Sequence, residues 1–305
     1  NMKKKIFTSL GLMSGTSMDG VDLSIIKSDG VNYVEQIYDK YFEFDDNLHD
    51  SLVNLRKCLN KSGDLDKYYK KIKEIEKKYT LFNCKIINEI KSKNNLEIDL
   101  IGFHGQTILH LPKEKISEQL GDGNLLSQIS ICTVINRFRQ NDLDNNGQGA
   151  PLTPIFHGLV SKKIQENFDL EYPMNIINIG GITNVSQIIN SKNLEKNIFA
   201  YDIAPGNCLI DEWIRKNSNK RYDENGDIAN KGKVNDLILN QAIENFEIVS
   251  IKESLDIKNF DLSFAKGLSL QDGCATLTKF TAYLISEGLK KIDKINNSQT
   301  KNYIL

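Results

Sequence analysis

A strand, a glycine-rich loop and a second strand occur twice in this chain, and this repeat constrains the fold more than any other feature. The first copy spans residues 6–27, with the loop GTSMDG at 15–20. The second copy spans residues 175–189, with the loop GGITN at 180–184. One such loop is typical of many β-hairpins. Two in corresponding places predict a duplicated α/β domain, with a cleft between the halves in which a ligand could bind.

Hydrophobic periodicity predicts alternating strands and helices elsewhere in the chain. A strand at 33–44 would complete an antiparallel meander with the first two. Further strands are expected at 99–103, 133–138, 199–202 and 302–305. Helices are expected at 46–60, 66–93, 124–131, from Pro151 onward, and at 208–217, 233–247 and 271–292. We therefore expect an N-terminal domain over residues 1–132 and a C-terminal domain over 133–305.

Composition excludes several classes of protein. The 305 residues are 40% hydrophobic and 26% charged, as in ordinary globular proteins. The net charge of -1 gives no electrostatic footprint for nucleic acid or for an anionic membrane. No apolar run approaches the roughly 18 residues of a membrane helix. The five cysteines are scattered without a C-x-x-C pair, which indicates reduced thiols in a cytoplasmic protein.

The densest cluster of chemically useful residues is GLMSGTSMDGVD at 11–22. Its glycines let the backbone approach an anion, and its hydroxyls and N–H groups can donate to phosphate oxygens. Asp19 could hold Mg²⁺, which favours carboxylates together with substrate phosphates. The segment is not a Walker A loop, because Val21 stands where that loop requires lysine. The alternative is an ordinary hairpin turn.

Three other segments carry weaker signals. The loop at 180–184 combines glycines with a hydroxyl side chain, as the first glycine loop does. Residues 202–207 place a carboxylate at a strand end and a glycine before a helix, which indicates either an anion site or a helix capped by Asn207. His104, at the end of a strand, could contact a sugar or be a buried structural histidine. Residues 147–152 could be a flexible loop before a helix.

Together these segments resemble the anhydro-N-acetylmuramic acid kinase family. The matching pieces occur in family order: GLMSGTSMDGVD at 11–22, GFHGQT at 102–107, GDG at 121–123, GQGAPL at 147–152, NIGGITN at 178–184, and PGN at 205–207 with Asp211. Each piece is weak evidence by itself. The ordered set covers essentially the whole chain and makes the resemblance specific.

The resemblance implies a fold and a reaction. The fold would be the actin-like, sugar kinase and Hsp70 type, in which two ribonuclease H-like α/β domains enclose ATP and sugar. The reaction would use ATP and water to convert 1,6-anhydro-N-acetylmuramic acid to N-acetylmuramic acid 6-phosphate in peptidoglycan recycling. Catalysis would depend on positioning the transferring phosphoryl group and on neutralising its negative charge, with help from a metal ion. A homodimer would fit the family, although no segment specifies an interface.

The resemblance also implies roles for individual residues. Asp19 is expected to hold Mg²⁺ and to take part in catalysis. Contacts with ATP are expected from Gly15, Thr16, Ser17, Met18, Asp19, Gly20, Val21, Asp22, Gly180, Gly181, Asn184, Asp202, Gly206 and Asn207. Contacts with the sugar are expected from His104, Gln106, Thr107, Arg139 and Gln148.

The sequence departs from the family at the general base. The family has Asp-Phe-Arg before the GQGAPL segment, and this Asp activates the attacking water. Arg137 occupies that position here, and a shift of one residue would place Asn136 there instead. Neither side chain is a useful base, and losing a general base costs about 10²- to 10⁴-fold in rate. An active chain would need another group, and Asp122 and Asp142 are candidates.

The second departure is the C-terminal end. Family members continue past the strand at 302–305 into an adenosine loop and further helices, so the C-terminal domain is expected to be truncated. Both departures favour an alternative, a catalytically impaired relative that binds nucleotide or amino sugar as a sensor or scaffold. A chaperone-like or actin-like ATPase is a third possibility, against which GFHGQT and GQGAPL argue.

Overall fold

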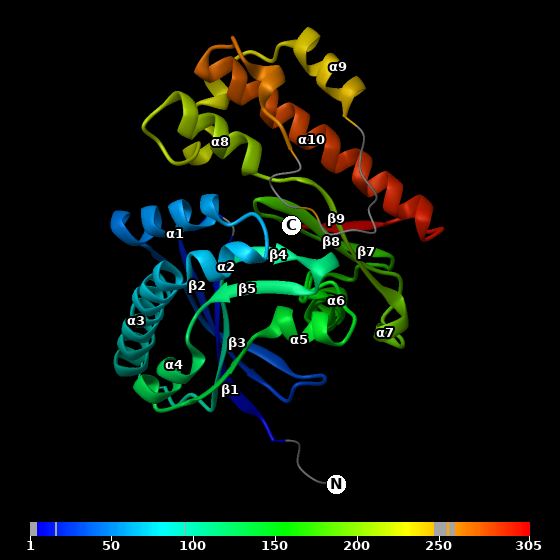
Figure 1. Cartoon of the computed structure of the whole chain (residues 1–305). Helices are drawn as coiled ribbons and strands as arrows, with labels where there is room; N and C mark the ends of the chain where they lie inside the picture. Colours follow the sequence, from blue (N-terminus) through cyan, green and yellow to red (C-terminus); the bar gives the residue numbers. More distant parts are fainter. Residues whose placement is uncertain (1–4, 16, 95, 247–254, 256–259) are drawn as a thin grey trace. The chain divides into compact units, whose positions relative to one another are not determined.

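A computed structural model describes residues 5–15, 17–94, 96–246, 255 and 260–305 (Figure 1). The chain divides into two compact units, Asn1–Leu152 and Thr153–Leu305. Each unit is a mixed α/β structure with its own sheet. Among the described residues, no helix combines the length and apolar character needed to cross a membrane.

The first unit is built on a six-stranded sheet. Its strands are β1 (Phe7–Ser14), β2 (Gly20–Ser28), β3 (Val34–Glu43), β4 (Leu100–Leu111), β5 (Ile116–Leu120) and β6 (Thr133–Asn136). Its helices are α1 (Asp46–Cys58), α2 (Gly63–Lys67), α3 (Tyr69–Asn94), α4 (Gly123–Ser130) and α5 (Phe138–Asp144), with the short 3₁₀ helix η1 (Pro112–Glu114).

The order of strands in this sheet is β3-β2-β1-β4, with β5 and β6 both paired to β4. The first three strands form the expected antiparallel meander. β4 then lies parallel to β1, and β6 lies parallel to the first part of β4. The second part of β4 pairs antiparallel with β5. The glycine loop between β1 and β2 therefore lies next to the middle of β4, where Ser14 is in register with Gln106.

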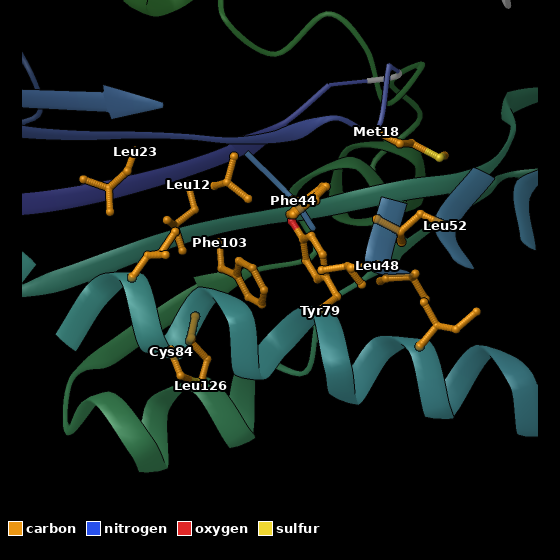
Figure 2. Close-up of a cluster of buried hydrophobic side chains, with 14 of the residues drawn as sticks. Leu12, Met18, Leu23, Phe44, Leu48, Leu52, Tyr79, Cys84, Phe103 and Leu126 are labelled. Carbon is orange, nitrogen blue, oxygen red and sulfur yellow. The ribbon is translucent and has the colours of Figure 1, made fainter. Parts of the chain in front are cut away.

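Alternation of apolar residues along the strands creates one buried face. In β2, the side chains of Val21, Leu23 and Ile25 are all fully buried, with exposed residues between them. Figure 2 shows this cluster, in which Tyr79 of α3 stacks on Phe103 of β4 with ring centroids 6.0 Å apart. The helices α1 and α3 supply the other side of this core.

Replacing Leu52 of α1 by alanine tests the importance of this core. Leu52 is fully buried, so Leu52→Ala should lower the free energy of unfolding of the first unit by about 2–5 kcal/mol. Leu81→Ala is the matched control, because Leu81 on α3 is 42% exposed and its loss should cost less than about 1 kcal/mol. Urea unfolding followed by circular dichroism measures both. Equal losses for the two variants would contradict this description of the core.

The second unit is built on a four-stranded sheet. Its strands are β7 (Met174–Ile179), β8 (Ile182–Ile188), β9 (Ile198–Pro205) and β10 (Asn302–Ile304). Its α-helices include α6 (Pro154–Phe168), α7 (Leu194–Asn197), α8 (Cys208–Asn217), α9 (Asp236–Asn245) and α10 (Leu270–Ile295). Short 3₁₀ helices lie at η2 (Glu224–Gly226), η3 (Ala229–Lys231) and η5 (Ser263–Ala265).

The second sheet repeats the strand order of the first. Its order is β10-β7-β8-β9, with β7, β8 and β9 antiparallel and β10 parallel to β7. The first unit has the same arrangement, because β4 lies parallel to β1 beside the meander β1-β2-β3. Each sheet thus contains a three-stranded meander with one parallel strand beside it, and each meander opens with a strand, a glycine loop and a strand, as the repeated glycine loops predict.

The structure differs from the sequence-based expectations in several elements. The division between units follows Leu152 rather than residue 132, because β6 pairs with β4 of the first sheet. β4 continues to Leu111, whereas the sequence predicts a strand ending at residue 103. The helix expected at 66–93 is interrupted at Tyr68. The helix expected to open at Pro151 begins at Pro154 instead.

Candidate functional site

The loop between β1 and β2 is fixed at both ends by hydrogen bonds. Ser14 Oγ donates to the carbonyl oxygen of Gly20 across 2.6 Å. Gln106 Nε2, from β4, donates to the carbonyl oxygen of Gly15 across 2.9 Å. Gly20 must be glycine, because a Cβ there would lie 2.4 Å from the carbonyl oxygen of Phe42. The loop is therefore held in a defined shape, as a preorganised anion site requires.

Two carboxylates lie close together at this loop. Ser17 Oγ donates to Asp19 Oδ1 across 2.7 Å, and the Tyr41 hydroxyl also hydrogen bonds to Asp19. Burial, followed by the charge of Asp19, raises the pKa of Asp22 above its ordinary value. Repulsion between two carboxylates is relieved when a divalent cation binds between or beside them. These residues therefore fit Mg²⁺ whose other ligands are phosphate oxygens and water.

The side chains of the loop do not all face a ligand. Met18 and Val21 are buried in the core at 1% and 0% exposure, so only their backbone atoms could contact phosphate. Ser17 is exposed and Asp19 is partly exposed. Thr16 lies outside the described residues. Among the described residues, no group of three or more His, Cys, Asp or Glu side chains is arranged to hold a metal ion.

His104 is placed as a structural histidine that positions Arg139. Its Nδ1 lies 2.7 Å from the carbonyl oxygen of Gly105, and its Nε2 accepts a hydrogen bond from Arg139 Nε at 2.8 Å. Both contacts are satisfied by the neutral ring with its proton on Nδ1. Burial first, and then the charge of Arg139, lower the pKa of His104 from 6.5 to about 4. Arg139 Nη1 also donates to the Gly149 carbonyl oxygen at 3.4 Å, so Arg139 links His104 to the GQGAPL segment.

This neutral histidine makes stability depend on pH. Between pH 6.5 and about 4 the unfolded chain binds a proton at His104 that the folded chain does not bind. Stability is therefore complete above pH 6.5 and decreases as the pH falls through this window, by up to about 3 kcal/mol. His104→Gln should lose less stability than the wild type between pH 7 and pH 5 in urea unfolding. An equal loss in both proteins would contradict a depressed pKa at His104.

Three other expected sugar contacts are placed differently. Gln106 is fully buried and binds the Gly15 carbonyl, so the structure gives it the role of anchoring the glycine loop. Thr107 is 7% exposed and lies near Gln119, whose Nε2 is 3.5 Å from its hydroxyl. Gln148 is exposed in the loop after α5. Of the three, Gln148 is the side chain with the greatest exposure to an incoming ligand.

A polar pocket of about 460 Å³ lies beside His104 in the first unit. Its volume is ordinary for a small-molecule site. Its lining is unusually rich in charged and amide groups, including Lys73, Glu76, His104, Glu118, Asp122, Asn136, Arg137 and Gln140. Lys73, Glu76 and Glu118 belong to no sequence motif described above. Lys73 and Glu76 lie on α3, and Glu118 lies on β5, a strand without apolar alternation, so no local pattern marks these side chains.

Arg137 lies in this pocket, at the start of α5. Its backbone is left-handed, with φ of 59°, and its side chain does not cap the helix. The side chain is exposed, and it makes no hydrogen bond or ion pair with the residues that the structure describes. Asn136, the alternative at this position, also lines the pocket. The position at which the resemblance places the family's base is therefore part of the pocket.

The two carboxylates considered as substitutes for the missing base have structural roles. Asp142 Oδ2 accepts a hydrogen bond from the Gly149 amide at 2.8 Å. The Asp142 carboxylate also lies so close to Gly147 that a Cβ on this residue would be 2.0 Å from the same oxygen. Asp122 is the N-cap of α4, where its Oδ1 accepts from the amides of Asn124 and Leu125, each at 3.0 Å. Of these two carboxylates, Asp122 also lines the pocket.

In the second unit, the two glycine segments meet at the start of α8. The amide of Gly206 donates to the Gly181 carbonyl oxygen at 3.0 Å, and the amide of Asn207 donates to that of Gly180 at 2.7 Å. A Cβ on Gly206 would lie 2.1 Å from the Gly180 oxygen, so glycine is required there. The second glycine loop is therefore bound to the N-terminus of a ten-residue helix.

The other expected residues of the second unit surround this junction. Asn207 is exposed and is the N-cap residue of α8, but its side chain makes no capping hydrogen bond, so the capping role proposed from the sequence is wrong. Asn184 is partly buried on β8. Asp202 Oδ2 accepts from the amide of Leu255 at 2.9 Å. An exposed helix N-terminus with an adjacent glycine loop can bind an anion.

Comparison with known proteins identifies the family. The sequence pattern of the family described as anhydro-N-acetylmuramic acid kinase matches residues 7–300. The chain belongs to the anhydro-N-acetylmuramic acid kinase family. It is 49% identical to the anhydro-N-acetylmuramic acid kinase of Pelagibacter ubique strain HTCC1062, over 99% of this chain and 79% of that protein.

More distant members of the family match in the same way. The anhydro-N-acetylmuramic acid kinases of Agrobacterium fabrum and Rhizobium etli are 35% and 33% identical, over 92% and 90% of this chain and 75% and 74% of those proteins. Among solved structures, an exopolyphosphatase-like protein aligns over 79% of this chain and 61% of that chain, with 11% identity. Its TM-score of 0.35 is too low to support an argument about the fold.

Proposed function

We propose that this chain uses ATP and water to convert 1,6-anhydro-N-acetylmuramic acid to N-acetylmuramic acid 6-phosphate, as expected for its family. The observation that carries the proposal is the anchored β1–β2 loop with Asp19 and Asp22, joined through β4 to the charged pocket beside His104. Phosphoryl transfer needs a rigid anion site with carboxylates for a metal ion, and sugar recognition needs a polar pocket.

The proposal assigns distinct roles to two neighbouring positions in the middle of β4, His104 and Gln106. Gln106 holds the phosphate loop in shape through the Gly15 carbonyl. His104 and Arg139 hold the GQGAPL segment beside the pocket. Mg²⁺, bound by Asp19 with phosphate oxygens, would neutralise charge on the transferring group. The amides of Gly206, Asn207 and Cys208 already donate to carbonyl oxygens of the second glycine loop, so a phosphate contact at the start of α8 would use the remaining N–H groups of its first turn.

The proposal extends to the fold type and the setting of the enzyme. Each sheet has a three-stranded meander and a further strand that is parallel to the first strand of the meander. This shared strand order supports a ribonuclease H-like fold for each unit. Two such units are expected in the actin-like kinase fold. The cysteines of the chain are free thiols, in keeping with a cytoplasmic enzyme. The near-neutral net charge of -1 supports a small-molecule substrate rather than nucleic acid. We also propose that the enzyme forms a homodimer, as the resemblance implies.

The experiment that tests the function is product formation measured by mass spectrometry. The chain is incubated with Mg²⁺, ATP and the anhydro sugar, with parallel reactions that omit ATP or the sugar. The expected result is the sugar 6-phosphate together with an equal amount of ADP. Release of ADP without sugar would favour an ATPase instead. Binding of sugar or nucleotide with no product would favour the catalytically impaired relative.

A further inference from the structure

The proposed reaction consumes water, and the proton of that water needs an acceptor. When the water oxygen bonds to the anomeric carbon, one O–H bond must break. The guanidinium of Arg137 stays protonated and cannot accept this proton. The inference that follows rests on the proposed function and concerns which group of the pocket takes over this step.

Glu118 is the carboxylate of the pocket whose oxygens are least engaged. It lies on β5, opposite Leu109 of β4, and lines the pocket together with Arg137 and His104. Its side chain is partly buried, yet its carboxylate makes no hydrogen bond or ion pair with other residues in the described parts of the chain. A carboxylate of this kind can accept a proton without breaking any existing contact.

The other pocket carboxylates are committed to the fold. Glu76 Oε2 accepts from Lys73 Nζ at 2.6 Å, and its Oε1 lies 3.4 Å from the amide of Gly121. Asp122 caps α4 through two backbone amides. Protonating either of these groups would weaken the contacts that hold the pocket wall. Glu118 carries no such penalty.

The charges around Glu118 suit a base. Burial, and then the charge of Glu76, raise the pKa of Glu118 above its ordinary value of 4.5. Lys73 and Arg137 oppose this increase and favour the ionised form. His104, the titratable group that lines the pocket from β4, is neutral at physiological pH. A raised pKa strengthens a base, and the two cations favour the ionised form, which is the form that accepts a proton.

We infer that Glu118 is the general base of this chain, and that Arg137, which lines the same pocket, supports it with a positive charge. Glu118 accepts one proton from water as the water oxygen bonds to the anomeric carbon. The bond from that carbon to the bridging oxygen breaks, and the bridging oxygen bonds to the γ-phosphorus. The bond from phosphorus to the ADP oxygen breaks, and ADP leaves. Glu118 finally releases its proton to solvent.

Glu118→Gln is the direct test, because it keeps the shape of the side chain and removes the base. Its kcat should fall by about 10²- to 10³-fold, while KM for sugar and ATP stays within a few-fold. The matched control is Glu114→Gln, on exposed η1, which should retain wild-type kcat. Glu118→Asp should recover part of the lost rate. More than a tenth of the wild-type kcat in the Gln variant would overturn the inference.

The pH dependence of kcat separates a base from a merely structural residue. Activity should decrease as the pH falls through the pKa of Glu118, because the protonated carboxyl cannot accept a proton. Arg137→Gln removes a charge that lowers this pKa, so the acidic limb of the profile should move to higher pH. An unmoved limb would overturn the inference. The proposed function fails separately, and the inference with it, if the wild-type chain forms no product.

Discussion

Asp19→Asn should reduce kcat by about 10³-fold while leaving the fold intact. The amide keeps the shape of the side chain and can still accept the hydrogen bond from Ser17 Oγ, which spans 2.7 Å. It removes the negative charge that would hold Mg²⁺ against the transferring phosphate, and losing one strong electrostatic contact of this kind costs about 10²- to 10³-fold. Product formation at saturating ATP and sugar measures the loss.

The Mg²⁺ requirement provides an independent readout of the same change. The Mg²⁺ concentration for half-maximal rate should increase in the Asp19→Asn variant, because the cation loses a ligand. Asp39→Asn is the control, since Asp39 is an exposed carboxylate on β3 of the same sheet. A variant within fivefold of the wild-type rate, with unchanged Mg²⁺ dependence, would show that Asp19 does not serve the cation.

Gly206→Ala should damage the second unit and its phosphate contact together. The added Cβ would lie 2.1 Å from the Gly180 carbonyl oxygen, a backbone atom that cannot rotate away. The two segments must then separate, which breaks the hydrogen bond from Asn207 to Gly180 at 2.7 Å. We expect a loss of about 1–3 kcal/mol in unfolding free energy and at least tenfold weaker ATP binding.

The control for this substitution is a glycine in open space. Gly63, in α2, has no neighbour within 4 Å of an added Cβ, so Gly63→Ala should leave stability within about 1 kcal/mol of the wild type. Urea unfolding and calorimetric titration with ATP measure the two effects. Unchanged stability and affinity in Gly206→Ala would mean that the junction adjusts freely and is not the built anion site proposed here.

Much of the fold could be predicted because the strongest signals are local. The helix expected at 208–217 is present with the same bounds, because its apolar residues recur at helical spacing. The meander of β1, β2 and β3 follows from alternating apolar residues and turn glycines. The strand expected at the end of the chain is confirmed as β10, at Asn302–Ile304.

The missed elements depend on partners that are distant in sequence. β5 contains Ser117, Glu118 and Gln119, which have no apolar alternation, and it is a strand because it pairs with β4. β4 itself continues through Gly105, which has a positive φ of 78°. A glycine after an apolar strand is typical of a turn, so the sequence predicts that the strand ends there. Such a segment becomes a strand because its hydrogen bonds go to a neighbouring strand, which no local pattern contains.

In the candidate site, too, some residues could be predicted from local sequence and others could not. The sequence motifs locate the glycine loops, because the glycines that these loops require can be read directly from the sequence. The roles of His104 and Gln106 could not be assigned, since these roles depend on Arg139 and on the Gly15 carbonyl. The role proposed for Glu118 has no signal in the sequence, because the charges that act on Glu118 come from Glu76, Lys73 and Arg137, which are distant from it along the chain.

The single tryptophan of the chain makes the two units distinguishable by fluorescence. Trp213 is 5% exposed in the core of the second unit, where its indole N–H donates to the Leu270 carbonyl oxygen at 3.0 Å. Its emission therefore reports the unfolding of that unit alone, whereas a backbone signal reports both. Because each unit has its own hydrophobic core, the two signals need not coincide. Where the two signals separate, the denaturation curve contains two free energies of unfolding, and Leu52→Ala and Gly206→Ala should each lower a different one.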